Sequence, residues 1–166
     1  TKNIVYLAEP LKKRDLQKDI RFLAFQEVGK RHGLTDEKIL EQTFIGFDED
    51  LWQEEFAKYL AKNRQVDAIF ARNDRLAATA SQIAQTFGRK IPNDIMILGV
   101  DNSSISRLIT PSITTIEQQK EEMSRAAIEL IESMNQGAKN GTLQRQETEK
   151  VFTTKLIERD STNRPE

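Results

Sequence analysis

Two apolar segments separated by one amphipathic helix constrain the fold of this chain more than any other feature. Residues 66–71 (VDAIFA) form a short apolar run with β-branched and aromatic side chains, and residues 95–100 (IMILGV) are too continuously apolar for a strand with one wet face. Between them, apolar residues recur at the helical spacings of 4, 3 and 4: Leu76, Ala80, Ile83 and Phe87. With Gly88 ending the helix, the segment predicts two parallel strands joined by a helix, in a sheet covered on both sides.

A polar residue follows each of these two strands. Asn73 and Asp74 follow the first strand, and Asp101 follows the second. Because ligands of such sheets bind beyond the carboxyl ends of the strands, Asn73 and Asp101 are candidate binding residues. Asparagine and aspartate also cap helices well, so we expect Asp74 to cap the helix and Asn73 to direct its amide into the cleft. The carboxylate of Asp101 needs partners that donate hydrogen bonds, because a carboxylate at the end of a buried strand is costly without them.

The residues before this unit predict two further strand–helix pairs. The first strand is expected at 3–8, followed by a helix over 15–32 that a glycine ends, and the second strand at 39–47, followed by a helix over 48–63. Apolar residues at helical spacing predict the buried side of the first helix: Leu16, Ile20, Leu23, Ala24 and Val28. Trp52 shares the apolar stripe of the second helix, which favours packing, and the alternative is contact with a subunit partner.

The residues after the unit predict a return to the same sheet. We expect a loop or single helical turn at 103–109, a strand at 113–116, a strongly amphipathic helix over 119–135, a polar linker at 137–149 and a last strand at 151–157. The fold class that follows is α/β, with a Rossmann-like parallel sheet flanked by helices.

The charge balance argues against direct DNA binding by this chain. Its 25 basic and 26 acidic side chains leave no basic excess to neutralise phosphates. The absence of cysteine excludes disulfides and thiolate metal sites and fits a reducing cytoplasm. There is no signal peptide, and no apolar run approaches the roughly 20 residues that span a bilayer. We therefore expect a cytoplasmic protein without a membrane partner.

No motif of a common α/β enzyme occurs in the sequence. It lacks a Gly-x-Gly-x-x-Gly or phosphate-binding loop, a Gly-x-Ser-x-Gly elbow and a metal-ligand cluster. His32, the only histidine, precedes the helix-ending Gly33, where placement at the surface explains it better than catalysis does. We expect neither an enzyme nor a cofactor or metal site.

Several segments in a fixed order carry a resemblance to a known family: DAIFARNDRLA, GRKIPNDIMILGVDNS, PSITTI and ERDST. They are weak singly and specific in combination. From about Ile4 to Thr162, the chain resembles the sugar-sensing domain of the lactose/galactose-repressor (LacI/GalR) family of bacterial transcription regulators. The resemblance implies a lobe of the periplasmic-binding-protein-like type I fold.

The resemblance also implies that the chain is one part of a larger arrangement. Residues 1–110 would form the C-terminal lobe of an effector-binding domain, residues 111–149 a strand, helix and linker of the N-terminal lobe, and residues 150–166 the returning strand and tail. The N-terminal helix-turn-helix DNA-binding domain would be absent from this chain. The apolar side of the helix over 119–135 would then lack its sheet, so we expect it to dock on its own lobe, swap with another copy or stay mobile.

The family pattern points to a set of binding residues. An arginine followed three residues later by glycine or alanine and then an aromatic clamps sugar hydroxyls or an anion in that family, and Arg21 stands in this pattern; the alternative is a surface arginine. The resemblance assigns Asp101 to sugar hydroxyls, and Asn73 is a further candidate contact. Phe44 or Phe47 could offer a flat apolar face to a sugar ring, and the alternative is that both are core.

The resemblance implies the function of an effector-sensing domain. A sugar or sugar derivative would bind between two lobes and alter operator binding by the attached DNA-binding domain, which alone would contact DNA. A homodimer is implied because paired half-sites require paired DNA-binding domains. The alternative is a sugar-binding protein of a transport system with the same fold, and the PSITTI and ERDST segments favour the regulator.

Overall fold

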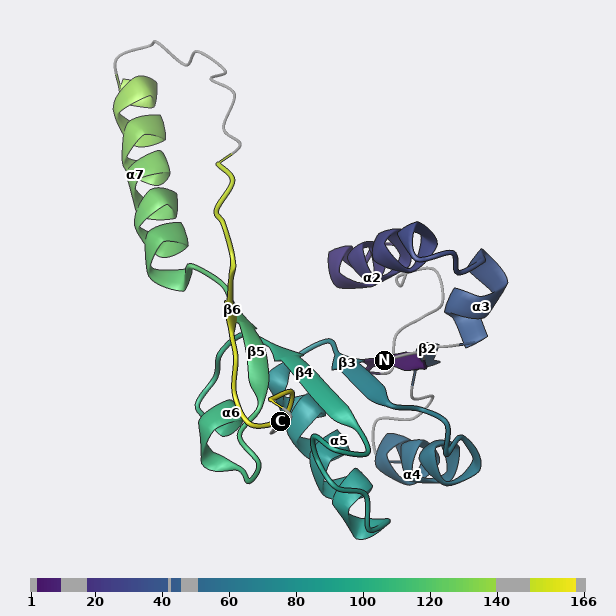
Figure 1. Cartoon of the computed structure of the whole chain (residues 1–166). Coiled ribbons are helices and arrows are strands. Elements are labelled where there is room, and N and C mark those ends of the chain that lie inside the picture. The colour runs from purple at the N-terminus through teal and green to yellow at the C-terminus, as the bar shows by residue number, and fades with distance from the viewer. Residues whose placement is uncertain (1–2, 10–17, 42, 46–50, 140–149, 164–166) are drawn as a thin grey trace. The chain divides into compact units, whose positions relative to one another are not determined.

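The computed structural model describes the following residues: 3–9, 18–41, 43–45, 51–139 and 150–163 (Figure 1). The chain divides into two compact units. Unit 1 comprises residues 1–116 and 156–166, and unit 2 comprises residues 117–155. The candidate binding residues that the structure describes all belong to unit 1.

A six-stranded sheet organises unit 1. Its strand order is β2-β1-β3-β4-β5-β6, and the pairs from β2 through β5 are parallel. The strands have these bounds: β1 Ile4–Ala8, β2 Thr43–Ile45, β3 Ala68–Ala71, β4 Met96–Val100, β5 Thr114–Glu117 and β6 Lys155–Ile157. Ile69 of β3 lies opposite Ile97 of β4, so the predicted parallel pair is confirmed, and with it the α/β fold class.

In unit 1, helices pack on both faces of the sheet (Figure 1). The described helices of the whole chain have these bounds: α2 Ile20–Arg31, α3 Asp36–Glu41, α4 Trp52–Lys62, α5 Asp74–Thr86 and α6 Ile105–Leu108 in unit 1, and α7 Lys120–Lys139 in unit 2. Side chains of α2 and α3 share one core cluster, and side chains of α4 and α5 share another on the opposite face. The predicted single helical turn after β4 is confirmed as α6.

The alternation of side chains along β1 divides the core in two. Val5 and Leu7 point into the cluster of α4 and α5, whereas Tyr6 and Ala8 point into that of α2 and α3. All four side chains are at most 1% exposed. Trp52 is 3% exposed in the cluster of α4 and α5, which confirms packing over contact with a subunit partner.

Burial of β4 differs from the prediction of a strand covered on both sides. Ile97 and Val100 are buried, but Met96 and Leu98 are only partly buried. The difference arises because the cluster of α2 and α3 reaches across β1 to Phe70 of β3 and includes no residue of β4.

The predicted buried side of α2 is wrong. Ile20 and Val28 are 75% and 51% exposed, and the buried residues are Phe22, Phe25 and Gly29. Two stripes interleave on this helix, and the aromatic one has more apolar area to remove from water. It also meets α3, because a Cβ added at Gly29 would lie 3.3 Å from the side chain of Ile39. Leu16 lies outside the described residues, while Leu23 and Ala24 are exposed.

The predicted strand over 39–47 is also partly wrong, because its first residues form α3. The Thr35 hydroxyl accepts a hydrogen bond at 3.3 Å from the backbone N–H of Lys38, which satisfies a donor at the start of that helix. Ile39 is fully buried from this helix rather than from a strand. Only Thr43–Ile45 pair with β1, and residues 46–50 lie outside the described residues.

The strand predicted over 113–116 is β5, and it pairs with β4 in the sheet. Residues up to 116 therefore belong to the same unit as residues 1–110, and the chain leaves unit 1 after this strand. The last strand is shorter than predicted, since β6 begins at Lys155 rather than at 151.

Unit 2 contains the predicted amphipathic helix, α7. The helix extends to Lys139, so it includes the first residues of the predicted linker, and residues 140–149 lie outside the described part. Four of its large apolar side chains stay 43–59% exposed: Met123, Ile128, Ile131 and Met134. Whether this apolar side docks on its own lobe, swaps with another copy or stays mobile therefore remains a prediction.

A close approach between α5 and β4 makes Gly99 necessary. A Cβ at this position would overlap a carboxylate oxygen of Asp74, lie 3.2 Å from the Cα of that residue and lie 3.3 Å from the Cβ of Ala77. Two of these three obstacles are backbone or the first side-chain carbon, which cannot rotate away. Only glycine leaves room for α5 to start where it does.

Gly99→Ala should lower the free energy of unfolding by about 2–3 kcal/mol, because the added methyl forces α5 away from the sheet. Urea denaturation followed by circular dichroism measures this. Gly29→Ala is the matched control, since its obstacle is the movable Ile39 side chain and alanine gains up to about 1 kcal/mol of helix propensity. Equal stability of Gly99→Ala and the wild type would contradict the close approach.

Candidate functional site

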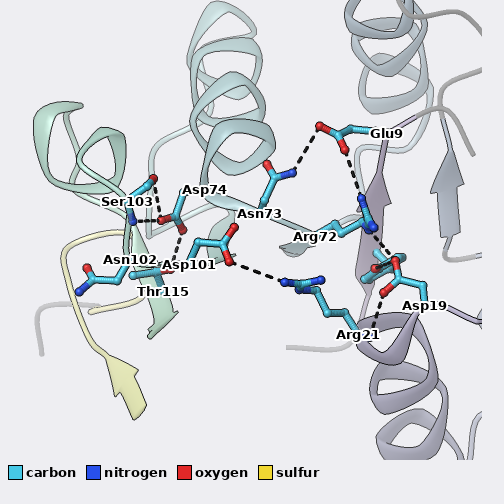
Figure 2. A network of polar contacts seen from close by, with 11 residues as sticks. Glu9, Asp19, Arg21, Arg72, Asn73, Asp74, Asp101, Asn102, Ser103 and Thr115 are labelled. Carbon is cyan, nitrogen blue, oxygen red and sulfur yellow. Dashed lines mark hydrogen bonds and ion pairs between the residues drawn. The ribbon is translucent and has the colours of Figure 1, made fainter. Parts of the chain in front are cut away.

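The carboxyl edge of the sheet brings two of the predicted binding residues together (Figure 2). Arg21, in the first turn of α2, forms an ion pair with Asp101, directly after β4, at 3.6 Å. Their side chains are 27% and 30% exposed. An ion pair in contact with water is weak, so a ligand with suitable hydrogen-bonding groups can replace it without a large loss.

The backbone at Asp101 adopts an uncommon conformation. Asp101 has a φ of 109° and Asn102 a φ of 46°, in the region that favours glycine. The Asp101 N–H donates to the carbonyl of Ile116 at 2.8 Å, and the Asn102 N–H donates to the hydroxyl of Thr115 at 3.2 Å. Both bonds reach β5, so the neighbouring strand holds the turn that carries the carboxylate.

Arg159 holds the same turn from the other side. Its guanidinium donates to the side-chain carbonyl of Asn102 at 2.6 Å, to the hydroxyl of Ser106 at 3.1 Å and to the carbonyl of Ile113 at 2.8 Å. This arginine belongs to the ERDST segment, which supported the resemblance but carried no assigned role. The sequence feature that could have indicated its role was a single arginine in a segment that returns to the sheet.

The structure changes the expected roles of Asn73 and Asp74. The side-chain oxygen of Asn73 accepts a hydrogen bond from the backbone N–H of Leu76 at 2.9 Å, so Asn73 is the N-cap of α5. Its amide nitrogen donates to Glu9 at 3.4 Å. The prediction that Asp74 caps α5 is therefore wrong, because Asn73 does so. The prediction that Asn73 directs its amide into a cleft stays a prediction.

Asp74 instead supports the site from within the core. The residue is 1% exposed, and its carboxylate accepts hydrogen bonds from the backbone N–H and the hydroxyl of Ser103 at 2.7 and 3.0 Å. The hydroxyl of Thr115 adds a third bond at 2.5 Å. A buried carboxylate requires such partners, and they tie α5 to the loop after β4 and to β5.

A second charged group lies at the same edge and was not singled out in the sequence (Figure 2). Asp19, 7% exposed, caps α2 by accepting the backbone N–H of Arg21 at 3.0 Å. It also accepts from the Tyr6 hydroxyl at 3.0 Å and from Nε of Arg72 at 2.7 Å. Arg72 donates further to Glu9 at 3.2 Å. An aspartate two residues before Arg21, at a helix start, was the available signal.

Burial and hydrogen bonding set the protonation of this group. Burial, together with the negative charge of Asp19, raises the pKa of Tyr6, so its hydroxyl stays protonated and donates. Burial also raises the pKa of Asp19, but the hydrogen bonds from the Arg21 N–H, Tyr6 and Arg72 outweigh it and leave that pKa below its ordinary value. Asp19 is therefore a carboxylate in the folded protein at neutral pH.

Of the two phenylalanine candidates, the structure describes only Phe44, which packs against the core. The ring of Phe44 packs on Phe56 and Tyr59 of α4, with centroid distances of 5.0 and 5.2 Å, as the core alternative expects. Phe47 lies outside the described residues. His32 is exposed at the C-cap of α2, as predicted.

The described residues offer neither a metal site nor a membrane span. They contain no group of three or more histidine, cysteine, aspartate or glutamate side chains placed to hold a metal ion. Within the same part of the chain, no helix has the length and apolar character to cross a membrane.

Residues 1–162 match the family described as "Periplasmic binding protein-like domain". The chain belongs to this family. Among curated members with similar sequences, it is 36% identical over 104 residues to the HTH-type transcriptional regulator MalR of Clostridium butyricum, covering 63% of this chain and 29% of MalR. It is also 36% identical over 104 residues to the regulator DegA of Bacillus subtilis, covering 62% of this chain and 30% of DegA. The chain thus spans about a third of the length of these relatives.

Solved structures of the family share the fold. The complex of the transcriptional regulator CelR with cellobiose has a TM-score of 0.78 and 24% identity, and covers 96% of this chain and 46% of that one. A LacI family regulator from Arthrobacter sp. FB24 with lactose has a TM-score of 0.73, 23% identity and coverages of 96% and 56%. The lac repressor dimer bound to operator has a TM-score of 0.76, 20% identity and coverages of 96% and 45%. The predicted resemblance to lactose/galactose-repressor regulators is confirmed.

Asp19→Asn should make the protein less sensitive to acid. Because the folded-state pKa of Asp19 lies below its ordinary value of 3.8, the carboxylate stabilises the fold above that pH, and this stabilisation is lost as the pH falls through the folded-state pKa. Unfolding free energies measured between neutral pH and about pH 2 should therefore fall less steeply in the variant on the acid side. Asp36→Asn is the control: the pKa of Asp36 is also lowered, mainly by a hydrogen bond from Lys30, but its full exposure makes the change smaller. If the unfolding free energies of Asp19→Asn and the wild type fell equally steeply with acid, the lowered pKa assigned to Asp19 would be contradicted.

Proposed function

We propose that this chain is the effector-sensing part of a bacterial transcription regulator and that its effector is a sugar or sugar derivative. The ion pair between Arg21 and Asp101 at the carboxyl edge of the sheet carries this proposal. It is supported by the regulators among the relatives and by the cellobiose and lactose complexes of similar structures.

The chemistry of the ion pair suits a hydroxyl-bearing ligand. A guanidinium only donates hydrogen bonds and a carboxylate only accepts them, whereas a hydroxyl does both. Two neighbouring hydroxyls can therefore accept from Arg21 and donate to Asp101 at once. Asn73 adds its amide nitrogen, because its oxygen is committed to capping α5.

Regulation requires that the ligand bind two arrangements of the protein unequally. We infer that the ligand lies between this lobe and a second one and shifts their relative rotation, which alters operator binding by a separate DNA-binding domain. The near balance of 25 basic and 26 acidic residues supports DNA contact outside this chain. A non-enzymatic, cytoplasmic protein follows from this role, and the regulator relatives favour it over a sugar carrier of a transport system.

We also infer that the protein is a homodimer, as the similar lac repressor structure is. Leu108 is a candidate interface residue on unit 1, with its side chain 79% exposed at the end of α6. Burial against another copy would remove this apolar surface from water.

The ligand prediction is tested by thermal-shift measurements on the full-length protein with cellobiose and lactose. A sugar at about 100 times its dissociation constant should stabilise the fold by roughly 2.7 kcal/mol. Arg21→Ala and Asp101→Ala should each weaken binding about tenfold or more, because each removes a charged hydrogen-bond partner. Arg31→Ala, an exposed arginine of the same helix, is the matched control and should bind as the wild type does. Sugar binding that is unchanged in both site variants would contradict the assignment of Arg21 and Asp101 as ligand contacts.

The dimer prediction is tested by sedimentation velocity. Leu108→Glu should raise the dimer dissociation constant about tenfold or more, since it would bury an unpaired charge in the interface. Ile20→Glu, another exposed apolar residue at 75%, serves as the control on a different helix. A monomeric wild type, or an unchanged dimer in the Leu108 variant, would refute the interface.

A further inference from the structure

Arg72 connects the end of β3 to the start of α2 (Figure 2). Its backbone N–H donates to the carbonyl of Leu7 at 2.9 Å, which fixes the arginine beside β1. Its Nε donates to Asp19 at 2.7 Å, and the Asp19 side chain is 3% exposed. A hydrogen bond between charged groups at this depth is stronger than one at the surface.

The Asp19 carboxylate in turn sets where α2 begins. One oxygen accepts the backbone N–H of Arg21, and the other accepts from Tyr6 and Arg72. Tyr6 of β1 and Arg72, directly after β3, thus set the orientation of the carboxylate. Its other oxygen then caps the first turn of the helix. Loss of the Arg72 bond leaves a buried charge with fewer partners, which favours movement of the whole helix start towards water.

Arg21 is in the first turn, two residues after the cap, and its guanidinium must reach Asp101 across the edge. We infer that Arg72 is a positioning residue for effector binding, which acts through Asp19 to hold Arg21 opposite Asp101. This inference rests on the proposed function, because Arg21 and Asp101 are its proposed ligand contacts. Arg72 itself is committed to Asp19 and Glu9 and acts without touching the ligand.

Arg75 provides a matched comparison on the same surface. It carries the same charge three residues later, and it pairs with Glu9, as Arg72 does. Its side chain is 64% exposed, against 29% for Arg72, and its ion pair in the described structure is with Glu9 rather than with Asp19. Loss of Arg75 therefore changes the charge at the edge but leaves the start of α2 in place.

The first experiment needs no ligand. Hydrogen exchange of the first-turn amides of α2 is followed by NMR in the full-length wild type, Arg72→Gln and Arg75→Gln. Exchange at these amides should become about fivefold faster in Arg72→Gln, the effect expected for loss of a helix cap, and stay unchanged in Arg75→Gln. Amides of α4 report global stability and should not follow the change. Unaltered exchange at the start of α2 in Arg72→Gln would overturn the inference, whatever the effector is.

The second experiment separates positioning from general stability by a double-mutant cycle with cellobiose and lactose as probes. Arg72→Gln should weaken binding about fivefold when Arg21 is present and by less than about twofold in an Arg21→Gln background, because a residue that acts through Arg21 has no further effect once Arg21 is gone. Arg75→Gln should bind within about twofold of the wild type. Where Arg72→Gln does not fold, Arg72→Lys replaces it in both experiments, since lysine keeps the charge but cannot bond Asp19 and Glu9 with one planar fork.

The outcomes distinguish this inference from the proposed function. Independent losses that multiply in the double variant, or an Arg72 variant that binds as the wild type does, would overturn positioning while leaving the sensor role intact. Failure of both sugars to bind the wild type would count against the proposed function and therefore against a positioning role, even with faster exchange at the start of α2.

Discussion

The buried carboxylate of Asp74 is the interaction on which the rest of unit 1 depends. It receives hydrogen bonds from Ser103 and Thr115, which lie 29 and 41 residues further along the chain. These bonds join the start of α5, the loop after β4 and strand β5 into one block. Gly99 is the cost of this arrangement, since only a residue without a side chain fits beneath the carboxylate. The carboxyl edge that holds the candidate site is built on that block.

Much of this framework could be predicted from the sequence because it depends on local patterns. Apolar runs at 66–71 and 95–100 predict buried strands, and the helical spacing between them predicts α5. Position at the ends of parallel strands then brings Asp101 to the carboxyl edge of the sheet, and the resemblance adds Arg21, which pairs with it. Both steps need only the chain's own periodicity and a recognised motif.

The missed features depend on partners that are distant in the sequence. Asn73 and Asp74 are equally good capping residues, and what decides between them is the donors at Ser103 and Thr115. Likewise, α2 carries two interleaved apolar stripes, and the choice between them is made by Ile39 packing on Gly29. The hydrogen bond from Arg72 to Asp19 joins residues 53 positions apart, so no periodic pattern in the sequence indicates it.

The turn at Asp101 has a consequence for any attempt to make this protein more heat-resistant. A non-glycine residue at a φ of 109° costs folding free energy on the order of 1–3 kcal/mol, which glycine would recover. A selection that rewards thermal tolerance alone would therefore be drawn to glycine at this position and would discard the carboxylate. Stability and the proposed ligand contact compete directly at this one residue, so an engineered variant must be scored on both.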